Sequence, residues 1–271
     1  KGEGKESRIW PVAAAVSDWG GSGGRKNHIS PKAPKNLVPA LTIIGGKEAQ
    51  PHSRPYMAFV DIDTGRGVGN CGGFLIQPDV VVTAAHCNCN LGNITVLLGA
   101  HNVEIQEPDR QAIHVRRRIP HPKYNDETNE NDIMLLQLKH KARLTKAVDT
   151  IPLSKREMKK GTVCRVAGWG LTSNEATAKP SPTLQEVELK IMDKSLCLHY
   201  LHYVPSLMLC VGDPDVRRAS FWGDSGGPLV CDGKVQGIVS YGRRDGLPPR
   251  VFTNVSKYIS WIKKILRKLK P

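Results

Sequence analysis

Three short segments of the sequence carry side chains that could together hydrolyse an amide bond. They read VTAAHC, NDIMLLQL and GDSGGPL, and they hold His86, Asp132 and Ser225. Amide hydrolysis near neutral pH requires a nucleophile stronger than a resting serine hydroxyl, a base that takes its proton, and a carboxylate that holds the base in the right tautomer. Each segment offers one of these groups, so His86, Asp132 and Ser225 are the candidate catalytic residues.

The glycines beside Ser225 let the backbone approach a substrate closely. The N–H groups of Gly223 and Ser225 are the natural donors to an oxyanion, the negative oxygen that develops when a carbonyl is attacked. Each signal is weak alone, because a lone histidine is more often structural and Gly-Asp-Ser-Gly is more often a turn. Their combination indicates catalysis.

The elements that must position these residues are short strands. From Ile43 onward, β-prone runs alternate with Gly, Pro, Asn and Asp, as in ITVLLGA, IMLLQL, VCRVAGWG and VQGIVSYG. Many short strands with turn residues between them predict an all-β barrel or sandwich. Helical periodicity is clear only in residues 255–269, where four apolar side chains share one face and basic residues crowd the other. A basic amphipathic helix is therefore predicted at the C-terminal end.

Composition narrows the class of protein further. The 271 residues are 39% hydrophobic and 24% charged, which is typical of neither a disordered tail nor a membrane bundle. No apolar run approaches the roughly 18 residues of a membrane-spanning helix. The net charge of +14 implies attraction to polyanions, and the seven cysteines leave at least one unpaired if the others form disulfides.

Residues 1–42 differ from the rest of the chain. They are rich in Gly, Pro, Lys and Ser and have no periodic apolar pattern. The apolar run Ile9–Val16 is short and contains Pro11, which disfavours a signal peptide. We expect a disordered leader or propeptide-like segment here, whose origin the sequence leaves open.

The three segments, taken in the order His, Asp, Ser, resemble those of the chymotrypsin-like serine proteases. His86 and Asp132 are 46 positions apart, and Asp132 and Ser225 are 93 apart, which fits that family. The resemblance covers residues 43–271 and implies one protease domain of two six-stranded antiparallel β-barrels with a C-terminal α-helix. It further implies a serine endopeptidase that acts through an acyl-enzyme, without a cofactor or a metal.

The resemblance also implies activation by cleavage before Ile43. In the family, the α-amine freed at this position becomes buried and pairs with the carboxylate that precedes the catalytic serine, here Asp224. A buried ion pair that is costly to leave half-made can act as a switch. The preceding residues Ala40-Leu41-Thr42 offer neither a basic residue nor the short acidic dipeptide of granule proteases, so the route of cleavage is left open.

Three disulfides follow from the same resemblance: Cys71–Cys87, Cys164–Cys231 and Cys197–Cys210. This layout leaves Cys89 over and is typical of granzymes, cathepsin G and mast-cell chymases. Whole segments such as PHSRPYM and LCVGDP match this branch, and the closest resemblance is to granzyme B-like enzymes. The branch implies a secreted protein or one stored in the cytoplasmic secretory granules of immune cells.

The resemblance places the substrate pocket at Ala219, Ser220, Phe221 and Trp222, with Ser240, Tyr241 and Gly242 pairing with the substrate backbone. Ala219 stands where trypsin-like enzymes carry Asp, which disfavours cleavage after Lys or Arg. Arg250 matches the position from which granzyme B projects an arginine, and a guanidinium can bind a carboxylate bidentately. Preference for Asp, then Glu, is predicted. If Arg250 instead points to solvent, an apolar pocket would suit Phe, Leu or Met, as in chymases.

The positive charge and the resemblance to granzymes and chymases suggest binding partners. Basic clusters suggest anionic proteoglycan or heparin-like glycans, and the resemblance implies protein substrates and serpin-type inhibitors. No nucleic-acid binding motif accompanies the charge. Asn93 and Asn254 match the glycosylation acceptor pattern. The rival hypothesis is a non-catalytic cationic antimicrobial or glycan-binding protein, but relatives of that kind have lost catalytic residues that this chain retains.

Overall fold

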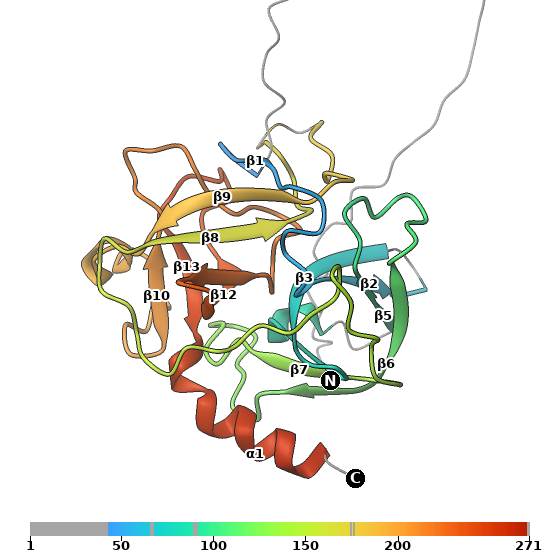
Figure 1. The fold of residues 1–271 in the computed structure, drawn as a ribbon. Helices are drawn as coiled ribbons and strands as arrows, with labels where there is room; N and C mark the ends of the chain where they lie inside the picture. Colours follow the sequence, from blue (N-terminus) through green and yellow to red (C-terminus); the bar gives the residue numbers. More distant parts are fainter. Residues whose placement is uncertain (1–42, 66–67, 89–91, 174, 176, 270–271) are drawn as a thin grey trace, which may run out of the picture. The chain divides into compact units, whose positions relative to one another are not determined.

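The computed structural model describes residues 43–65, 68–88, 92–173, 175 and 177–269 (Figure 1). The predicted leader, residues 1–42, and the unassigned Cys89 lie outside the described residues. None of the helices in the described ranges has the length and apolar character needed to cross a bilayer.

Six antiparallel strands form a closed barrel in the order β2-β3-β4-β7-β6-β5. Closure leaves no strand with unpaired backbone groups along an edge. β4 and β7 are buried along their whole length, in agreement with their continuous apolar sequences. The strands are β2 (Met57–Asp63), β3 (Val68–Gln77), β4 (Val80–Thr83), β5 (Asn93–Leu98), β6 (Gln111–Pro120) and β7 (Met134–Leu138).

The second half of the fold is a seven-stranded antiparallel sheet in the order β1-β9-β8-β11-β12-β13-β10. Its strands are β1 (Lys47–Glu48), β8 (Val163–Gly168), β9 (Gln185–Lys190), β10 (Met208–Val211), β11 (Pro228–Cys231), β12 (Lys234–Tyr241) and β13 (Arg250–Asn254).

This sheet refines the prediction of a second six-stranded barrel. β9 and β10 meet only at the isolated bridge between Ile191 and Val211. The Met192 N–H donates to the Cys210 carbonyl at 2.8 Å, and the Gly212 N–H donates to the Lys190 carbonyl at 2.9 Å. This contact lies just beyond the last paired residues of β9. The six strands from β8 to β13 are therefore closed by a single bridge and not by a continuous row of hydrogen bonds. β1 adds a seventh strand beside β9.

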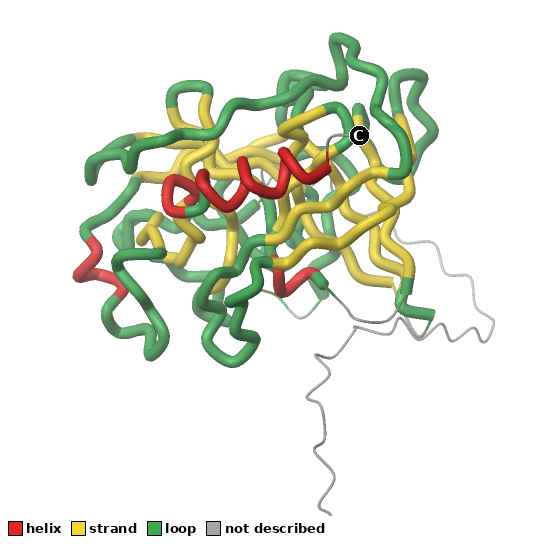
Figure 2. Tube along the Cα trace, turned by 90° about the horizontal axis from the view of Figure 1, so that it is seen from below, coloured by secondary structure: helices red, strands yellow, loops and turns green. Residues whose placement is uncertain are grey.

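The predicted C-terminal helix is present as α1 (Ile259–Leu269). Ile262 is buried, and Trp261, Ile265, Leu266 and Leu269 pack against the core of the first barrel. The basic residues Lys263, Lys264, Arg267 and Lys268 are exposed. Seen from below, the helix crosses the strands with one side against them (Figure 2). Its apolar face therefore anchors the end of the chain to the barrel.

Three disulfides link the elements, in the predicted pairing: Cys71–Cys87, Cys164–Cys231 and Cys197–Cys210. The first joins β3 to the residue after His86, in the 3₁₀ turn η1 (Ala85–Cys87). The second joins β8 to β11, and the third joins the turn η2 (Lys194–Cys197) to β10.

Removing the two disulfides of the second half should destabilise the chain unequally. The bridges close segments of 67 and 13 residues. Because a longer closed segment restricts the unfolded chain more, we expect losses of roughly 4 and roughly 3 kcal/mol for the paired Cys164→Ala/Cys231→Ala and Cys197→Ala/Cys210→Ala variants. Urea unfolding monitored by fluorescence measures both losses. Equal losses, or the reverse order, would contradict the chain-entropy account.

Candidate active site

Both halves of the fold contribute to the site. His86 lies in η1, directly after β4 of the first barrel, and Asp132 lies in the turn that leads into β7. Ser225 precedes β11 of the second sheet. The Gly72 N–H of β3 donates to the Ser225 carbonyl at 2.7 Å. This bond holds the serine loop against the strand that carries the Cys71–Cys87 bridge, one residue from His86.

Asp132 and His86 make two hydrogen bonds. The His86 Nδ1 atom lies 2.8 Å from Asp132 Oδ2, and the His86 backbone N–H donates to Asp132 Oδ1 at 2.9 Å. The Ser240 hydroxyl donates to the same Oδ2 atom at 2.5 Å. Asp132 is fully buried, whereas the His86 side chain is 27% exposed. The carboxylate is thus held by donors from both halves, and the imidazole still reaches the surface.

A tight turn aims Asp132 at the histidine. Asn131 has a φ of +57°, and the Ile133 N–H donates to the Asn131 carbonyl at 2.8 Å, across Asp132. Asparagine tolerates this left-handed conformation better than most residues. Its amide donates to the Lys123 carbonyl at 2.8 Å and accepts from the Tyr258 hydroxyl at 3.3 Å. These contacts fix the turn and hence the direction of the carboxylate.

Ser225 is half-buried in the loop that precedes β11. The Cys87 sulfur lies 3.8 Å from the Ser225 carbonyl oxygen. In the described part of the chain, no hydrogen bond joins the Ser225 hydroxyl to His86. Such bonds are often long or misaligned without substrate and tighten when it binds. The arrangement can therefore activate a hydroxyl once a substrate fixes its direction.

The electrostatics of the pair suit a general base. Burial by itself would lower the pKa of His86, but the charge of Asp132 and its hydrogen bond raise that pKa above its ordinary value. Burial would raise the pKa of Asp132, yet the contacts from His86 and Ser240 lower it. Asp132 is accordingly ionised near neutral pH, and His86 takes a proton more readily than a free imidazole.

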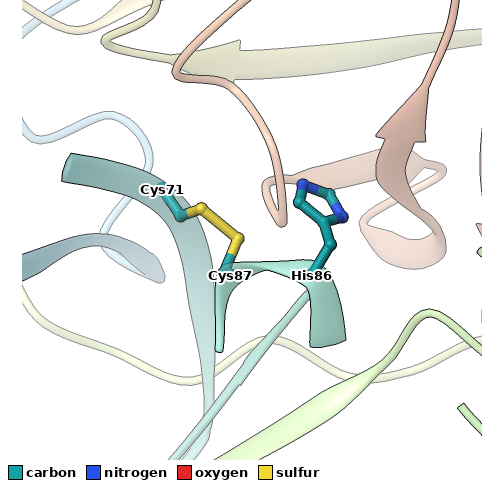
Figure 3. Close-up of side chains that lie close together, drawn as sticks. All are labelled: Cys71, His86 and Cys87. Carbon is teal, nitrogen blue, oxygen red and sulfur yellow. A yellow bond between two sulfur atoms is a disulfide. The ribbon is translucent and has the colours of Figure 1, made fainter. Parts of the chain in front are cut away.

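The side chains of Cys71, His86 and Cys87 lie close enough together to suggest three metal ligands. Figure 3 shows that the two sulfur atoms are bonded to each other, and that the His86 ring stands beside the bridge. A disulfide offers no thiolate, which is the form of cysteine that binds metals. This group therefore positions His86 and is not a metal site.

The loop before Ser225 has the shape that the oxyanion donors require. Gly223 has a φ of +94°, and a Cβ atom there would lie 2.8 Å from the Gly170 Cα atom. Only glycine adopts this conformation without strain in such limited space. The backbone N–H groups of Gly223 and Ser225 thus lie on a constrained turn directly before and at the serine.

Asp224 is fully buried, and among the described residues it forms no salt bridge, although the charge of Arg250 acts on it from a distance. The Ile43 nitrogen is bonded to Thr42 and carries no charge. The Asp224 carboxylate accepts from the Phe221 N–H at 2.8 Å and from the Gly170 N–H at 3.0 Å. Burial raises its pKa to about 6, although these two bonds oppose the shift. The Ile43 side chain is fully buried in the core of the second sheet. The predicted ion pair therefore needs a chain that begins at Ile43.

Arg250, the first residue of β13, points inward and is only 8% exposed. Its Nη1 atom donates to the Arg243 carbonyl at 3.0 Å, and its Cζ atom lies 5.7 Å from the centre of the Phe221 ring. A Cβ atom on Gly242 would lie 2.8 Å from Cζ, so glycine makes room for the guanidinium. The solvent-facing alternative for Arg250 is wrong.

The other predicted pocket residues differ in burial. Ala219, Ser220 and Phe221 are buried, while Trp222 is 47% exposed. Tyr241 is half-buried at the end of β12. Among the described residues, the buried Ser220 Oγ and Arg250 Nε atoms have no hydrogen-bond partner. Unpartnered buried polar atoms are costly, so these two atoms have donor capacity that the described residues do not use.

The two predicted glycosylation sites differ. Asn93 is exposed at the start of β5. Asn254 is fully buried; its amide donates to Glu157 at 2.9 Å, and its Oδ1 accepts from the Ser256 hydroxyl at 2.7 Å. A glycan needs solvent around its asparagine. The prediction at Asn254 is therefore incompatible with this packing, and we retain only Asn93.

The sequence did not indicate two contacts of the site. Ser240 was expected only as a substrate-binding residue, but its hydroxyl also holds Asp132. Tyr200 was not singled out, although its hydroxyl donates to the Pro249 carbonyl beside Arg250 at 2.7 Å. Neither residue lies in a sequence motif with Asp132 or Arg250, so no pattern in the sequence pointed to these contacts.

Comparisons with known proteins agree with the fold and show the family. The family model described as "Trypsin" matches residues 43–262. Granzyme B of Homo sapiens is 52% identical over 230 residues, covering 83% of this chain and 92% of that protein. Chymase of Canis lupus familiaris is 51% identical over 234 residues, covering 85% and 92%. A solved structure described as "Structure of GrC" has a TM-score of 0.77 at 44% identity, covering 82% of this chain and 99% of that one.

The pKa of His86 should depend on Asp132. We expect His86 to titrate above 6.5, and below 6.5 in an Asp132→Asn variant, because burial then acts without the opposing charge. NMR titration of the imidazole signals measures both values. His121, whose pKa burial and Lys123 lower, serves as an internal control that Asp132→Asn should leave unchanged. A His86 pKa that stays the same in the variant would contradict this electrostatic assignment.

Proposed function

Because the chain belongs to the trypsin family of chymotrypsin-like serine proteases, in its granzyme and chymase branch, we propose that it is an endopeptidase that cleaves after Asp and, less readily, after Glu. The catalytic residues are His86, Asp132 and Ser225. The contact of 2.8 Å between His86 and Asp132 supports these roles, together with the serine loop that Gly72 holds beside them.

Catalysis takes place in two stages. The His86 Nε2 atom accepts the Ser225 hydroxyl proton while the Ser225 oxygen attacks the scissile carbonyl carbon. The tetrahedral intermediate collapses as His86 gives the proton to the leaving amine, and the acyl group stays on Ser225. Water then attacks this acyl-enzyme, with His86 again as the base, and releases the carboxylic acid and the free hydroxyl. Asp132 remains ionised throughout and stabilises the protonated imidazole.

Backbone groups position the substrate. The N–H groups of Gly223 and Ser225 donate to the oxyanion, whose charge is greatest in the transition state. The backbone of Ser240, Tyr241 and Gly242 pairs with the substrate as an added strand. Trp222, exposed at the pocket rim, contacts residues on the leaving-group side.

One observation carries the specificity: Arg250 is buried against Phe221 and Gly242 with its Nε atom unpartnered. A substrate carboxylate would supply the missing acceptor and a compensating charge, which makes a strong contact in a site shielded from water. Ser220 Oγ, also unpartnered, can donate to the same group. Ala219 supplies no carboxylate, so Lys and Arg side chains find no partner at the pocket floor.

Two rival functions are weaker. A chymase-like preference for Phe, Leu or Met would require Arg250 to leave the pocket, against its burial. A non-catalytic cationic antimicrobial or glycan-binding role would leave the retained His86 and Asp132 pair unexplained. We further propose secretion or storage in the secretory granules of immune cells, as the names of the relatives suggest.

Anionic proteoglycan or heparin-like glycans are the proposed storage partners, and serpin-type inhibitors are expected to act on the enzyme. The described basic clusters that support glycan binding are exposed or partly exposed and lie on β6, before the serine loop, after β12 and on α1. Salt should weaken such binding strongly. The clusters are Arg116–Arg118, Arg217–Arg218, Arg243–Arg244 and the basic residues of α1.

The specificity can be tested with short fluorogenic peptides that carry Asp, Glu, Phe, Leu or Lys before the scissile bond, on protein that begins at Ile43. We expect Asp cleavage first, Glu second, and a loss of about 100-fold or more in kcat/KM for Asp in an Arg250→Ala variant, because a buried charge contact is lost. Arg117→Ala, which removes an exposed arginine of β6, is the matched control. Phe cleavage without Asp cleavage would refute the role of Arg250, and no turnover of any peptide would refute catalysis.

Activation is proposed to occur by cleavage of the Thr42–Ile43 bond. The freed Ile43 ammonium then pairs with Asp224, which otherwise has two backbone N–H donors and the more distant charge of Arg250. This pairing orders the loop that carries the Gly223 and Ser225 N–H groups. The raised pKa of Asp224 in the uncleaved chain supports this view, because burial outweighs its two backbone hydrogen bonds and the charge of Arg250.

The uncleaved chain should lose stability as the pH rises. The Asp224 pKa of about 6 exceeds the unfolded value of 3.8, so the folded state binds the extra proton between these values. The contribution is fully present below pH 4 and is lost through pH 6, by roughly 3 kcal/mol. Unfolding measured against pH in a Ser225→Ala background should show this slope in the uncleaved chain. The slope should be absent from Asp224→Asn and from chains that begin at Ile43; an equal slope in all three would contradict the switch.

A further inference from the structure

Three leucine side chains project into solvent from one short segment, residues 196–202, which we call the leucine turn. Leu196, Leu198 and Leu201 are 39%, 63% and 89% exposed. The other large apolar side chains that are exposed in the described part of the chain lie singly, on separate segments. Single exposed apolar residues are ordinary, whereas a group of them within seven residues is the usual sign of an interaction surface.

The backbone of the leucine turn holds these side chains outward. Cys197 points into the protein and forms the disulfide to Cys210 of β10. The Leu198 N–H donates to the Ser195 carbonyl at 3.2 Å, and the Tyr200 N–H donates to the Cys197 carbonyl at 3.0 Å. Because a disulfide and successive hydrogen-bonded turns fix the backbone, the leucines on either side of Cys197 stay in solvent.

Basic side chains flank the leucine turn. Lys194 is the first residue of η2, two positions before the turn. Lys160 approaches the residue that caps η2 to 3.3 Å, and its side chain is 75% exposed. Arg243 and Arg244 are also exposed, and the Arg243 N–H donates to the Tyr200 hydroxyl at 3.2 Å. Four cations from three segments therefore lie around the leucines.

The carboxylates that pair with these cations are Asp193, Glu157 and Asp245. Most of these side chains are substantially exposed, and exposed ion pairs are weak because solvent competes for both partners. Their basic groups can therefore turn toward another anion. The chain as a whole carries a net charge of +14, so this surface attracts anionic partners.

Exposed leucines beside basic groups suit a lipid bilayer with anionic headgroups. Apolar side chains enter the boundary between headgroups and acyl chains, while Lys and Arg remain at the phosphates. A stable protein partner requires a much larger contact than one turn offers. Heparin-like glycans offer charge but no apolar surface. The combination of both features favours a membrane over either.

We propose that the leucine turn docks the protein on membranes that contain anionic phospholipids. Leu198 and Leu201, the two most exposed leucines, enter the bilayer surface, and the flanking Lys and Arg side chains contact lipid phosphates. The docking is peripheral and requires no membrane-spanning helix. It does not depend on which side chain the protease prefers before the scissile bond.

Vesicle flotation tests this docking on the full chain with Ser225→Ala, which prevents self-cleavage. The probes are vesicles of phosphatidylcholine alone and of phosphatidylcholine and phosphatidylserine in a two-to-one ratio, at physiological salt. We expect binding to the mixed vesicles to be about tenfold tighter than to the neutral ones. In Leu198→Ser/Leu201→Ser, binding to the mixed vesicles should fall about tenfold or more, because both apolar contacts are lost.

Leu144→Ser is the matched control, because Leu144 is 47% exposed near Arg143 and Lys146 on a different segment. It should change binding by less than about twofold. Leu198→Met/Leu201→Met, which keeps the turn apolar, should retain binding. Equal losses in Leu144→Ser and in the serine double variant, or no loss in the double variant, would show that charge alone attracts the chain and would overturn the inference.

Sedimentation velocity without lipid separates docking on a membrane from pairing of two copies through the leucine turn. We expect the parent chain and the serine double variant to sediment alike, as single chains. A dimer that the serine substitutions disperse, together with no vesicle binding by the parent chain, would overturn the inference in favour of self-association.

Discussion

The structure depends on one buried carboxylate. Asp132 has no exposed surface, and a buried charge is tolerated only when hydrogen bonds or opposite charges satisfy it. Its donors come from both halves of the fold: His86 from the first barrel, and the Ser240 hydroxyl from β12. The Thr253 hydroxyl of β13 also donates to the Asp132 backbone carbonyl at 2.8 Å. The barrel and the sheet must therefore stay in register for this charge to remain satisfied, so the same contacts support folding and the alignment of His86.

Arg250 is a second buried charge, and its hydrogen-bonding capacity is only partly used. Arg250 has one hydrogen-bonded nitrogen, a ring beneath it and an unpartnered Nε. Asp132 is fully satisfied by the protein, as a fixed part of a catalytic group should be, whereas Arg250 keeps unused donor capacity. Asp132 is therefore used by the protein itself, whereas Arg250 remains available to a ligand.

The relatives show why identity alone does not determine substrate preference. Granzyme B and chymase are almost equally similar to this chain, at 52% and 51% identity. In the proposed function, substrate preference depends on a few side chains around residues 219–222 and on Arg250, so the direction of one arginine counts for more than overall identity.

By itself, the sequence determined the catalytic candidates, the strand-rich class and the C-terminal helix, because these follow from residue type and local spacing. The three disulfides were predicted only through the family resemblance. Sequence patterns could not determine contacts between distant positions. Ser240 lies 108 positions from Asp132, and Tyr200 lies 49 from Pro249, so only the packing of separate strands reveals their roles. The burial of Asn254 and the single bridge between β9 and β10 likewise depend on neighbours from other segments. Only the tertiary structure placed Arg250 inside the pocket, because Gly242 and Phe221 make room for a guanidinium that its own strand could equally have turned toward water.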